Sequence, residues 1–213
     1  MPNYQKELEK ILAGISPDAA RPRLLLHCCC APCSSYVLEY LSRYFDITAD
    51  FYNPNISPAA EYRHRADELR RLIGEMPLSG SVTFEEGAYE PERFFEAVCG
   101  LEDCPEGGER CRVCFRLRLE QAAQRAKEGG FDWFTTTLTI SPLKNAAALN
   151  EIGTTLGEAY GVRFLPSDFK KREGYKRSIT LSHEYGLYRQ DFCGCAFSRA
   201  AREKEKQNET AVR

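Results

Sequence analysis

The sequence predicts an α/β fold, a single domain with a mostly parallel sheet flanked by helices. Short apolar segments of strand type alternate with longer segments whose apolar residues recur at helical spacing, which is typical of parallel sheets covered on both faces. No repeat, low-complexity tract or long linker divides the 213 residues. Four cysteines, in LLLHCCCAPCSS, follow the first predicted strand. Because ligands of such sheets bind at the carboxyl ends of the strands, we expect a cysteine-rich metal site there.

The predicted strands are short and bounded by turn-forming residues. Residues 23–27 (RLLLH) are apolar up to the cysteine loop, and residues 47–55 end in Asn-Pro-Asn. Residues 132–139 are rich in threonine and aromatic residues, which favour strands. Two further strands are predicted at residues 81–86 and 163–169.

The predicted helices fill the intervals between these strands. The first has apolar residues at a 3.6-residue period. Two Ser-Pro pairs, Ser57-Pro58 and Ser141-Pro142, predict helix starts with serine as the N-cap and proline in the first helical position. The predicted helices are residues 34–44, 57–74, 90–100, 110–128 and 141–161, with a mostly helical C-terminal part.

The chain is predicted to have three parts: an N-terminal helical segment (1–22), an α/β metalloenzyme domain (23–201) and a charged, flexible tail (202–213). Its first residues lack the apolar stretch of a signal peptide, and no apolar run approaches the roughly 18 residues of a membrane span. We therefore expect a protein of the reducing cytoplasm with no membrane partner. The net charge of −2 gives no global indication of nucleic acid, so any such indication must be local.

The 10 cysteines call for a chemical explanation. A core of this size does not need disulfides, and clustered cysteines in a reducing compartment more often indicate metal or redox chemistry. A Cys-x-x-Cys pair at a helix start, beside arginines, also favours the thiolate form. The cysteines form three groups: Cys28, Cys29, Cys30 and Cys33; Cys99, Cys104, Cys111 and Cys114; and Cys193 with Cys195.

One cysteine pair from the first group, together with Cys111 and Cys114, makes a four-sulfur site that suits a structural zinc or an iron–sulfur cluster. Adjacent cysteines make poor zinc ligands because neighbouring side chains diverge, whereas the iron atoms of a cubane cluster point in different directions. The spacing therefore favours a cluster. Simple packing of reduced thiols stays open, above all for Cys28, Cys99 and Cys104.

The pair Cys193 and Cys195 stands apart from the others. Gly194 between them permits the sharp turn that brings two sulfurs together, and such a pair can form an easily reduced disulfide. A reversible dithiol near a cluster would let the protein hold two electrons. The alternatives are a third pair of metal ligands and buried, inert thiols.

Seven segments resemble one enzyme family in their order and spacing: LLLHCCCAPCS, FYNPNI, EYRHR, GGERCRVCFRLRL, TTTLTISPLKN, SDFKKREGYKRS and EYGLYRQDFCGCAFS. From about Arg23 to Ser198 the chain resembles the cobalamin-independent epoxyqueuosine reductases. Members of that family reduce the epoxide of epoxyqueuosine to the alkene of queuosine, the last step in making this modified base at the wobble position of the tRNA anticodon. The resemblance implies tRNA with a G-U-N anticodon, an electron donor that the sequence does not identify, a [4Fe-4S] cluster and a redox-active cysteine pair.

The resemblance also implies roles for single residues. The implied redox pair is Cys193 and Cys195. Cys33 matches a family cysteine that could hold a second iron, with Asp168 or Asp191 as a carboxylate ligand. The implied cluster ligands are Cys29, Cys30, Cys111 and Cys114.

Removing an epoxide oxygen takes two electrons and two protons. The dithiol of Cys193 and Cys195 can supply the electrons by closing to a disulfide, while a cluster iron acts as a Lewis acid. Asp168 and Asp191 are the candidate proton donors, and a structural cap or salt bridge is the alternative for each.

Local basic residues carry the expectation of tRNA binding. Phe169 and Tyr175 lie among them, and charge interleaved with aromatic rings suits phosphate contacts and base stacking. A solvated helix face is the alternative explanation. The candidate tRNA-binding residues are Lys144, Lys170, Lys171, Arg172, Lys176 and Arg177.

Two other functions fit part of the sequence. A zinc-stabilised RNA-binding module without catalysis would use the basic residues and the second cysteine group, but it gives Cys193 and Cys195 no role. A sulfur-transferring tRNA enzyme that uses ATP would need a glycine-rich loop to hold phosphates. The loop CCCAPCSS contains proline and no glycine, so this second alternative is disfavoured.

Overall fold

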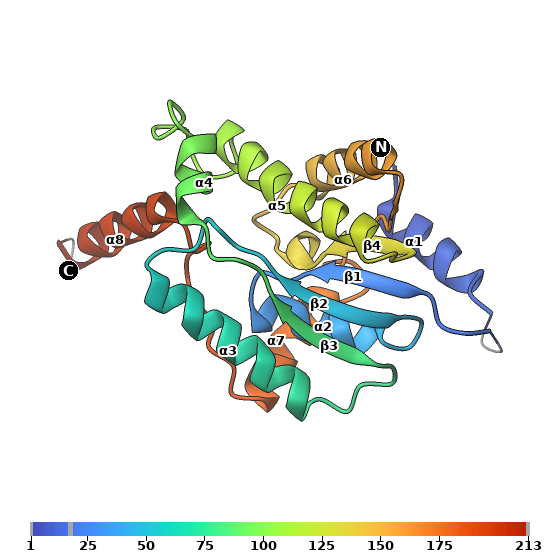
Figure 1. Cartoon of the computed structure of the whole chain (residues 1–213). Helices are drawn as coiled ribbons and strands as arrows, with labels where there is room; N and C mark the ends of the chain where they lie inside the picture. The colour runs from blue at the N-terminus through green and yellow to red at the C-terminus, as the bar shows by residue number, and fades with distance from the viewer. Residues whose placement is uncertain (1, 17–18, 212–213) are drawn as a thin grey trace.

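The computed structural model describes residues 2–16 and 19–211 and builds them around a five-stranded parallel sheet (Figure 1). The strand order is β3-β2-β1-β4-β5. The predicted α/β fold with one mostly parallel sheet is therefore confirmed. The strands are β1 (Arg23–His27), β2 (Asp46–Phe51), β3 (Val82–Glu86), β4 (Trp133–Thr136) and β5 (Arg163–Phe164).

Helices cover both faces of the sheet, as the alternation predicts. In Figure 1, α5 and α6 lie on one side of the strands and α2, α3 and α7 on the other. The helices are α1 (Tyr4–Ala13), α2 (Ala31–Leu41), α3 (Ala59–Glu75), α4 (Pro91–Ala97), α5 (Glu109–Glu128), α6 (Ala146–Tyr160), α7 (Gly174–Glu184) and α8 (Ala196–Ala211), with a 3₁₀ turn at Thr137–Ile140.

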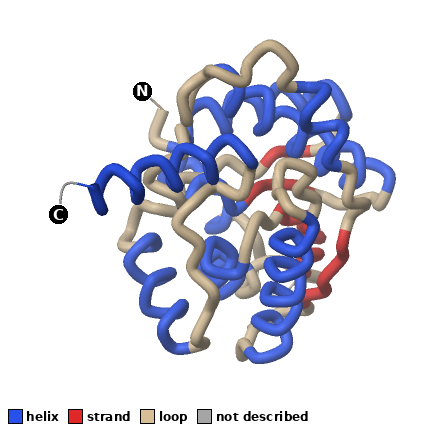
Figure 2. Tube along the Cα trace, turned by 90° about the vertical axis from the view of Figure 1, so that its left-hand side faces the viewer, coloured by secondary structure: helices blue, strands red, loops and turns tan. Residues whose placement is uncertain are grey.

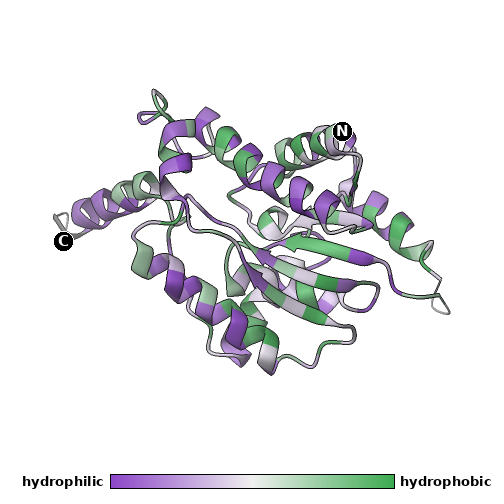
Figure 3. Ribbon diagram, viewed as in Figure 1, coloured by the Kyte–Doolittle hydropathy of each residue, from purple (hydrophilic) through white to green (hydrophobic). Residues whose placement is uncertain are grey.

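The core has two main parts because successive side chains of a strand point to opposite faces. On β1, Leu24 and Leu26 join the buried cluster that contains residues of α1, α2 and α3. Leu25, between them, joins the cluster formed with α5 and α6. Figure 3 shows β1 as mostly hydrophobic, which agrees with a strand that is covered on both faces.

The sheet changes direction at β1, and this positions the site. The chain proceeds from β1 to β2 and β3 on one side, then returns to place β4 and β5 on the other. The segments after β1 and β4 pass to opposite faces, and a crevice forms between such segments at the carboxyl ends of the strands. The cysteine loop follows β1, and the segment that carries Lys144 follows β4.

Three predicted strands are shorter than the sequence analysis indicates. Strand β2 ends at Phe51, and β5 comprises only Arg163 and Phe164. Strand β4 ends at Thr136, whose hydroxyl accepts a hydrogen bond from the Leu138 amide (3.1 Å) and turns the chain into a 3₁₀ helix. Threonine favours strands, but its side chain also competes for backbone hydrogen bonds, which ends this strand early.

Neither predicted Ser-Pro helix start is correct. Pro58 itself takes the N-cap position of α3. Helix α6 starts at Ala146, with the Asn145 side chain accepting from the Ala148 amide (3.1 Å), so residues 141–145 form a loop. Asparagine and serine are about equally good N-caps, so the observed contact of the Asn145 side chain, not residue type, decides where α6 begins.

Helix α2 begins three residues earlier than predicted, at Ala31, and ends at Leu41. Residues 202–211 of the stretch predicted to be a flexible tail belong to α8, which extends outward from the rest of the chain (Figure 2), and residues 212–213 lie outside the described residues. No helix among the described residues is both long and apolar enough to cross a membrane.

The buried Asp50 of β2 should make the stability of the folded protein depend on pH. Its buried carboxylate binds the Arg125 guanidinium from α5. Burial raises the pKa of Asp50 to about 6, against the lowering effect of Arg125. The folded state then binds more protons than the unfolded chain between about pH 4 and 6, so stability falls as pH rises through that window.

We expect urea unfolding at pH 4, 5, 6 and 7 to show this fall as a difference between the wild type and Asp50→Asn. The variant lacks the titrating group but keeps the shape of the side chain. The same pH dependence in both proteins would contradict this account.

Candidate active site

Each of the three cysteine groups has a member at the N-terminal end of a helix. Cys30 is the N-cap residue of α2, Cys111 lies in the first turn of α5, and Cys195 directly precedes α8. The free amides and the positive end of the helix dipole favour thiolates at such positions. This effect competes with burial, which raises the pKa of the Cys195 thiol.

The first group forms a compact sulfur triad. The sulfur atoms of Cys29, Cys30 and Cys33 all lie within 4.8 Å of one another, and the Sγ atoms of Cys29 and Cys30 are 3.8 Å apart. Cys28 does not belong to the triad: its thiol donates to the Leu26 carbonyl (3.4 Å), and burial raises its pKa well above the usual value. Cys28 is therefore a packed, protonated thiol.

Within the triad, one sulfur carries the negative charge. Hydrogen bonds from the thiols of Cys30 and Cys33, with a further contribution from the Lys144 cation, lower the pKa of Cys29 well below its usual value. The bond to Cys29 raises the pKa of Cys30 to about 11. Cys29 is thus the thiolate to which its neighbours donate.

Two cysteines of the second group meet both cysteines of the third group at a small cavity of about 20 Å³. The four cysteines that line this cavity are Cys111, Cys114, Cys193 and Cys195. The sulfur of Cys111 accepts a hydrogen bond from the Gly107 amide (3.2 Å). The buried Cys114 has a pKa raised to about 12, chiefly by desolvation. The segment 193–195 therefore lies directly against the start of α5.

The turn that carries Cys193 and Cys195 is fixed by hydrogen bonds. Ser198 binds both ends of it: its hydroxyl accepts from the Cys193 amide (3.0 Å), and its amide donates to the Cys195 sulfur (3.3 Å). Arg65 donates to the Cys193 carbonyl (3.1 Å). Gly194 has φ +117°, a conformation that other residues rarely adopt, as a sharp turn between the two cysteines requires.

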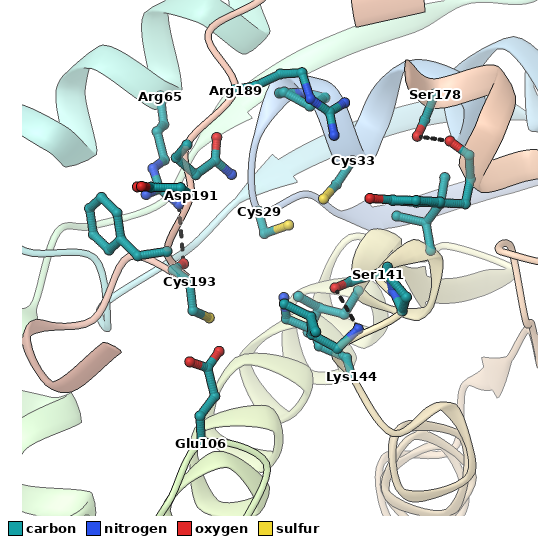
Figure 4. A pocket seen from close by; sticks show the side chains of 18 of the residues that line it. Cys29, Cys33, Arg65, Glu106, Ser141, Lys144, Ser178, Arg189, Asp191 and Cys193 are labelled. Carbon is teal, nitrogen blue, oxygen red and sulfur yellow. Dashed lines mark hydrogen bonds between the residues drawn. The ribbon is translucent and has the colours of Figure 1, made fainter. Parts of the chain in front are cut away.

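A larger cavity of about 340 Å³ adjoins this region, and Figure 4 shows Cys29, Cys33, Cys193 and Lys144 around it. Burial lowers the pKa of Lys144, but its electrostatic interactions with the nearby Cys193, Cys29 and Cys33 outweigh that effect and raise the pKa above its usual value. Lys144 is therefore a persistent cation facing the first and third cysteine groups.

Arg118 lines both cavities and lies among all three groups. It is 1% exposed, its Nε donates to the Cys114 carbonyl (3.2 Å), and its Nη2 has no hydrogen-bond partner in the described structure. Burial lowers its pKa, but nearby thiols, with Cys114 and Cys193 foremost, raise it overall. A buried cation without a carboxylate partner is costly, so this environment suits an anionic thiolate centre.

The segments that build these cavities match a family model described as "Epoxyqueuosine reductase QueH" over residues 24–201. The chain belongs to the QueH family. It is 44% identical over 198 residues to epoxyqueuosine reductase QueH of Streptococcus pyogenes, covering 92% of this chain and 78% of that protein. The QueH relative of Staphylococcus epidermidis is 46% identical over 200 residues, covering 92% and 84%.

The family extends to distant bacteria. Epoxyqueuosine reductase QueH of Thermotoga maritima is 38% identical over 187 residues, covering 87% of this chain and 94% of that protein. The resemblance stated from the sequence motifs is therefore confirmed, and with it the class of oxidoreductase.

The structure places Asp168 outside the lining of both cysteine cavities. It lines neither cysteine cavity but a separate depression beside α1, and its carboxylate binds Lys170 (2.6 Å). Asp191 does line the larger cavity, yet ion pairs with Lys206 (2.6 Å) and Arg202 (3.4 Å) lower its pKa. Asp191 is therefore ionised at neutral pH and poorly suited to donate a proton.

The basic residues of 170–177 are mostly paired with carboxylates. Lys171 is exposed and lines the depression beside α1, together with Arg172. Most of this positive charge is therefore neutralised locally, and it lies apart from the cysteines. The ion pairs are Lys170–Asp168, Arg172–Glu9, Lys176–Glu173, and Arg177 with Glu39 and Glu184.

His27 is a satisfied core residue. Its ring accepts from the Thr136 hydroxyl (2.9 Å) and donates to the Tyr52 carbonyl (3.1 Å), and burial lowers its pKa to about 4. The neutral ring ties the ends of β1 and β4 together beneath the cysteine loop.

Sequence reasoning missed Arg118 and Glu106, which line the larger cavity. Arg65, an arginine of the basic helix α3, lines it as well. A signal was present for Arg118, because it follows Cys114 and Phe115 at helical spacing on the buried stripe of α5. A charge on an apolar stripe is a sign of function, since burial must be compensated.

Proposed function

We propose that this protein is a cytoplasmic epoxyqueuosine reductase, which converts epoxyqueuosine to queuosine at the wobble position of tRNA with a G-U-N anticodon. The observation that carries the proposal is the meeting of three cysteine groups around two adjoining cavities at the carboxyl ends of the strands. Two-electron removal of an epoxide oxygen needs both a redox centre and a nearby two-electron donor, and these groups supply the residues for each.

Cys29, Cys30, Cys111 and Cys114 would hold a [4Fe-4S] cluster. The residues fit such a group in kind: all four donors are thiols, Cys30 and Cys111 lie at the N-terminal ends of α2 and α5, and the buried Arg118, whose Nη2 has no hydrogen-bond partner among the described residues, would balance negative charge. When bound, the cluster supplies single-electron transfer and a Lewis-acidic iron. A second iron at Cys33 would take Asp191, not Asp168, as its carboxylate, because only Asp191 lines the same cavity.

Cys193 and Cys195 supply the electrons in this proposal. Closing two thiols to one disulfide releases two electrons and two protons. Conversion of an epoxide to an alkene and one water consumes the same numbers, so the step balances. An external electron donor must then reduce the disulfide before the next turnover.

Lys144 would stabilise the negative charge that develops on the epoxide oxygen. Its cation is held at the cavity by the surrounding thiols, and a fixed positive charge at such a position lowers the barrier without rearrangement.

Replacing Lys144 with glutamine is expected to lower kcat by about 10²–10³-fold because it removes this charge. Iron content and the visible spectrum should be unchanged, since Lys144 is not a ligand. Single-turnover assays of epoxide loss would measure the effect. The matched control is Lys127→Gln, at an exposed lysine of α5 that lies outside both cysteine cavities and is not among the candidate tRNA-binding residues, and it should keep wild-type kcat. Equal rates for both variants would remove Lys144 from the chemistry.

The proposal is tested first by metal analysis of protein purified without oxygen, then by an epoxide-reduction assay on tRNA. About four irons and four acid-labile sulfides per chain, with formation of queuosine, would support it. One zinc and no sulfide, with RNA binding but no reduction, would favour the zinc-stabilised RNA-binding module instead.

A further inference from the structure

The two cysteines of the third group face different cavities. Cys193 lines both the larger and the small cavity, whereas Cys195 lines the small one alone. Cys193 is half-buried, while Cys195 is 8% exposed and its sulfur accepts a hydrogen bond from the Ser198 amide (3.3 Å). A molecule in the larger cavity therefore meets the side chain of Cys193, with Cys195 behind it.

Cys193 is also the thiol of the larger cavity that the proposed metal sites leave free. Among the described residues, three cysteines line this cavity: Cys29, Cys33 and Cys193. In the proposed function Cys29 binds the cluster and Cys33 a second iron, so Cys193 is the one that remains to react. Figure 4 shows Cys193 at this cavity together with Cys29 and Lys144.

The main chain of Cys193 is held from two sides. Its amide donates to the Ser198 hydroxyl (3.0 Å), and its carbonyl accepts from Arg65 (3.1 Å). A nucleophile that is fixed in this way needs little rearrangement to attack a bound substrate.

An epoxide suits a two-step reaction with two thiols. Each epoxide carbon is an electrophile, because attack on it opens a strained ring. An entering sulfur bonds on the face opposite the oxygen, so the C–S and C–O bonds end on opposite faces. Elimination to an alkene prefers that arrangement. A covalent intermediate of this kind divides one difficult step into two easier ones.

We propose that Cys193 is the nucleophile that opens the epoxide and that Cys195 is the resolving thiol that releases the product. This inference rests on the proposed function, because it assigns separate roles to the two thiols of that site. Cys193 and Cys195 are then not interchangeable, although both are needed for turnover.

The atoms and electrons of the two steps balance. First, the Cys193 sulfur bonds to one epoxide carbon, and the C–O bond that breaks leaves an alkoxide, which takes up a proton in the cavity that Lys144 also lines. Then the Cys195 sulfur bonds to the Cys193 sulfur, and the electron pair of the breaking C–S bond forms the alkene. The remaining C–O bond breaks to release hydroxide, which takes up a second proton. The two thiols have lost two protons and two electrons, and the products are a disulfide, an alkene and water.

The first test traps the covalent intermediate on iron-loaded Cys195→Ser with tRNA that carries epoxyqueuosine. No thiol reductant is added, because a small thiol could replace Cys195. Cys193 should accumulate a thioether to the opened nucleoside, approaching about one per chain, which survives ribonuclease digestion and is located by tandem mass spectrometry. Cys195→Ala should trap the same adduct. Cys193→Ser should trap none, and Cys104→Ser, at a cysteine outside both cavities, should turn over without accumulating it.

The second test needs no substrate and no variant. Iron-loaded wild type is treated briefly with iodoacetamide under reducing, oxygen-free conditions and then digested with trypsin. Arg189 and Arg199 bound one peptide that contains both cysteines, so fragment ions compare them directly. Alkylation at Cys193 should exceed that at Cys195 by about tenfold or more, because reagents reach partly exposed thiols more easily than buried ones.

An iron-loaded Cys195→Ser or Cys195→Ala protein that binds the tRNA but forms no adduct would overturn this inference. An adduct on Cys195 in Cys193→Ser, or equal alkylation of the two cysteines in the wild type, would do the same. Reduction of tRNA by the wild type would leave the proposed function standing in each of these cases. No reduction by the iron-loaded wild type would overturn the proposed function itself.

Discussion

Replacing Cys29 or Cys111 with serine is expected to remove the cluster, with iron falling from about four atoms per chain to nearly none. A serine hydroxyl does not ionise at neutral pH and is a poor ligand for iron compared with a thiolate. Loss of either ligand also leaves the buried Arg118 cation with less negative charge around it, which adds to the effect. Iron and sulfide analysis and the visible spectrum measure the outcome.

The matched control is Cys99→Ser. Cys99 is exposed and lines neither cysteine cavity, so this variant should keep its iron. Full iron content in both the Cys29 and Cys111 variants would show that other residues hold the metal. The two positions test different segments, the loop before α2 and the start of α5, so loss at only one of them would confine the site to that segment.

Replacing Cys193 or Cys195 with serine is expected to abolish multiple turnovers while iron content stays at the wild-type level. Neither residue is assigned as a ligand, but one remaining thiol cannot close to an intramolecular disulfide. Ser198 and Gly194 would still hold the backbone turn, so the fold should be retained. Turnover of tRNA and the iron content, measured on the same sample, report the two effects separately.

For this pair, Cys104→Ser serves as the control, because Cys104 lies outside both cavities. Wild-type turnover in the Cys193 and Cys195 variants would exclude the dithiol as the electron source. Loss of iron in these variants would instead indicate that the pair binds metal, one of the alternatives that the sequence leaves open.

The sequence by itself determined the sheet, the helices on its two faces and the position of the first cysteine group. These follow from local patterns: RLLLH is apolar and short, and the helices that follow carry apolar residues at regular spacing. Element ends were less well determined, because single side chains decide them. Thr136 ends β4 with one hydrogen bond, and Asn145 rather than Ser141 begins α6.

The tertiary structure alone decided which distant residues share the site. Cys111 and Cys195 are far apart in the chain, and their common cavity depends on how α5 and α8 pack. Asp168 and Asp191 look equivalent in the sequence, yet only Asp191 lines the larger cavity. Arg118 looks like one more charge on a basic helix, and only the fold shows that it is buried, with an Nη2 atom that has no hydrogen-bond partner among the described residues. The spacing of residues in the sequence predicts contacts between residues that are close along the chain. The site is built from residues that are far apart in the chain, and their contacts depend on how the helices and strands pack in the folded protein.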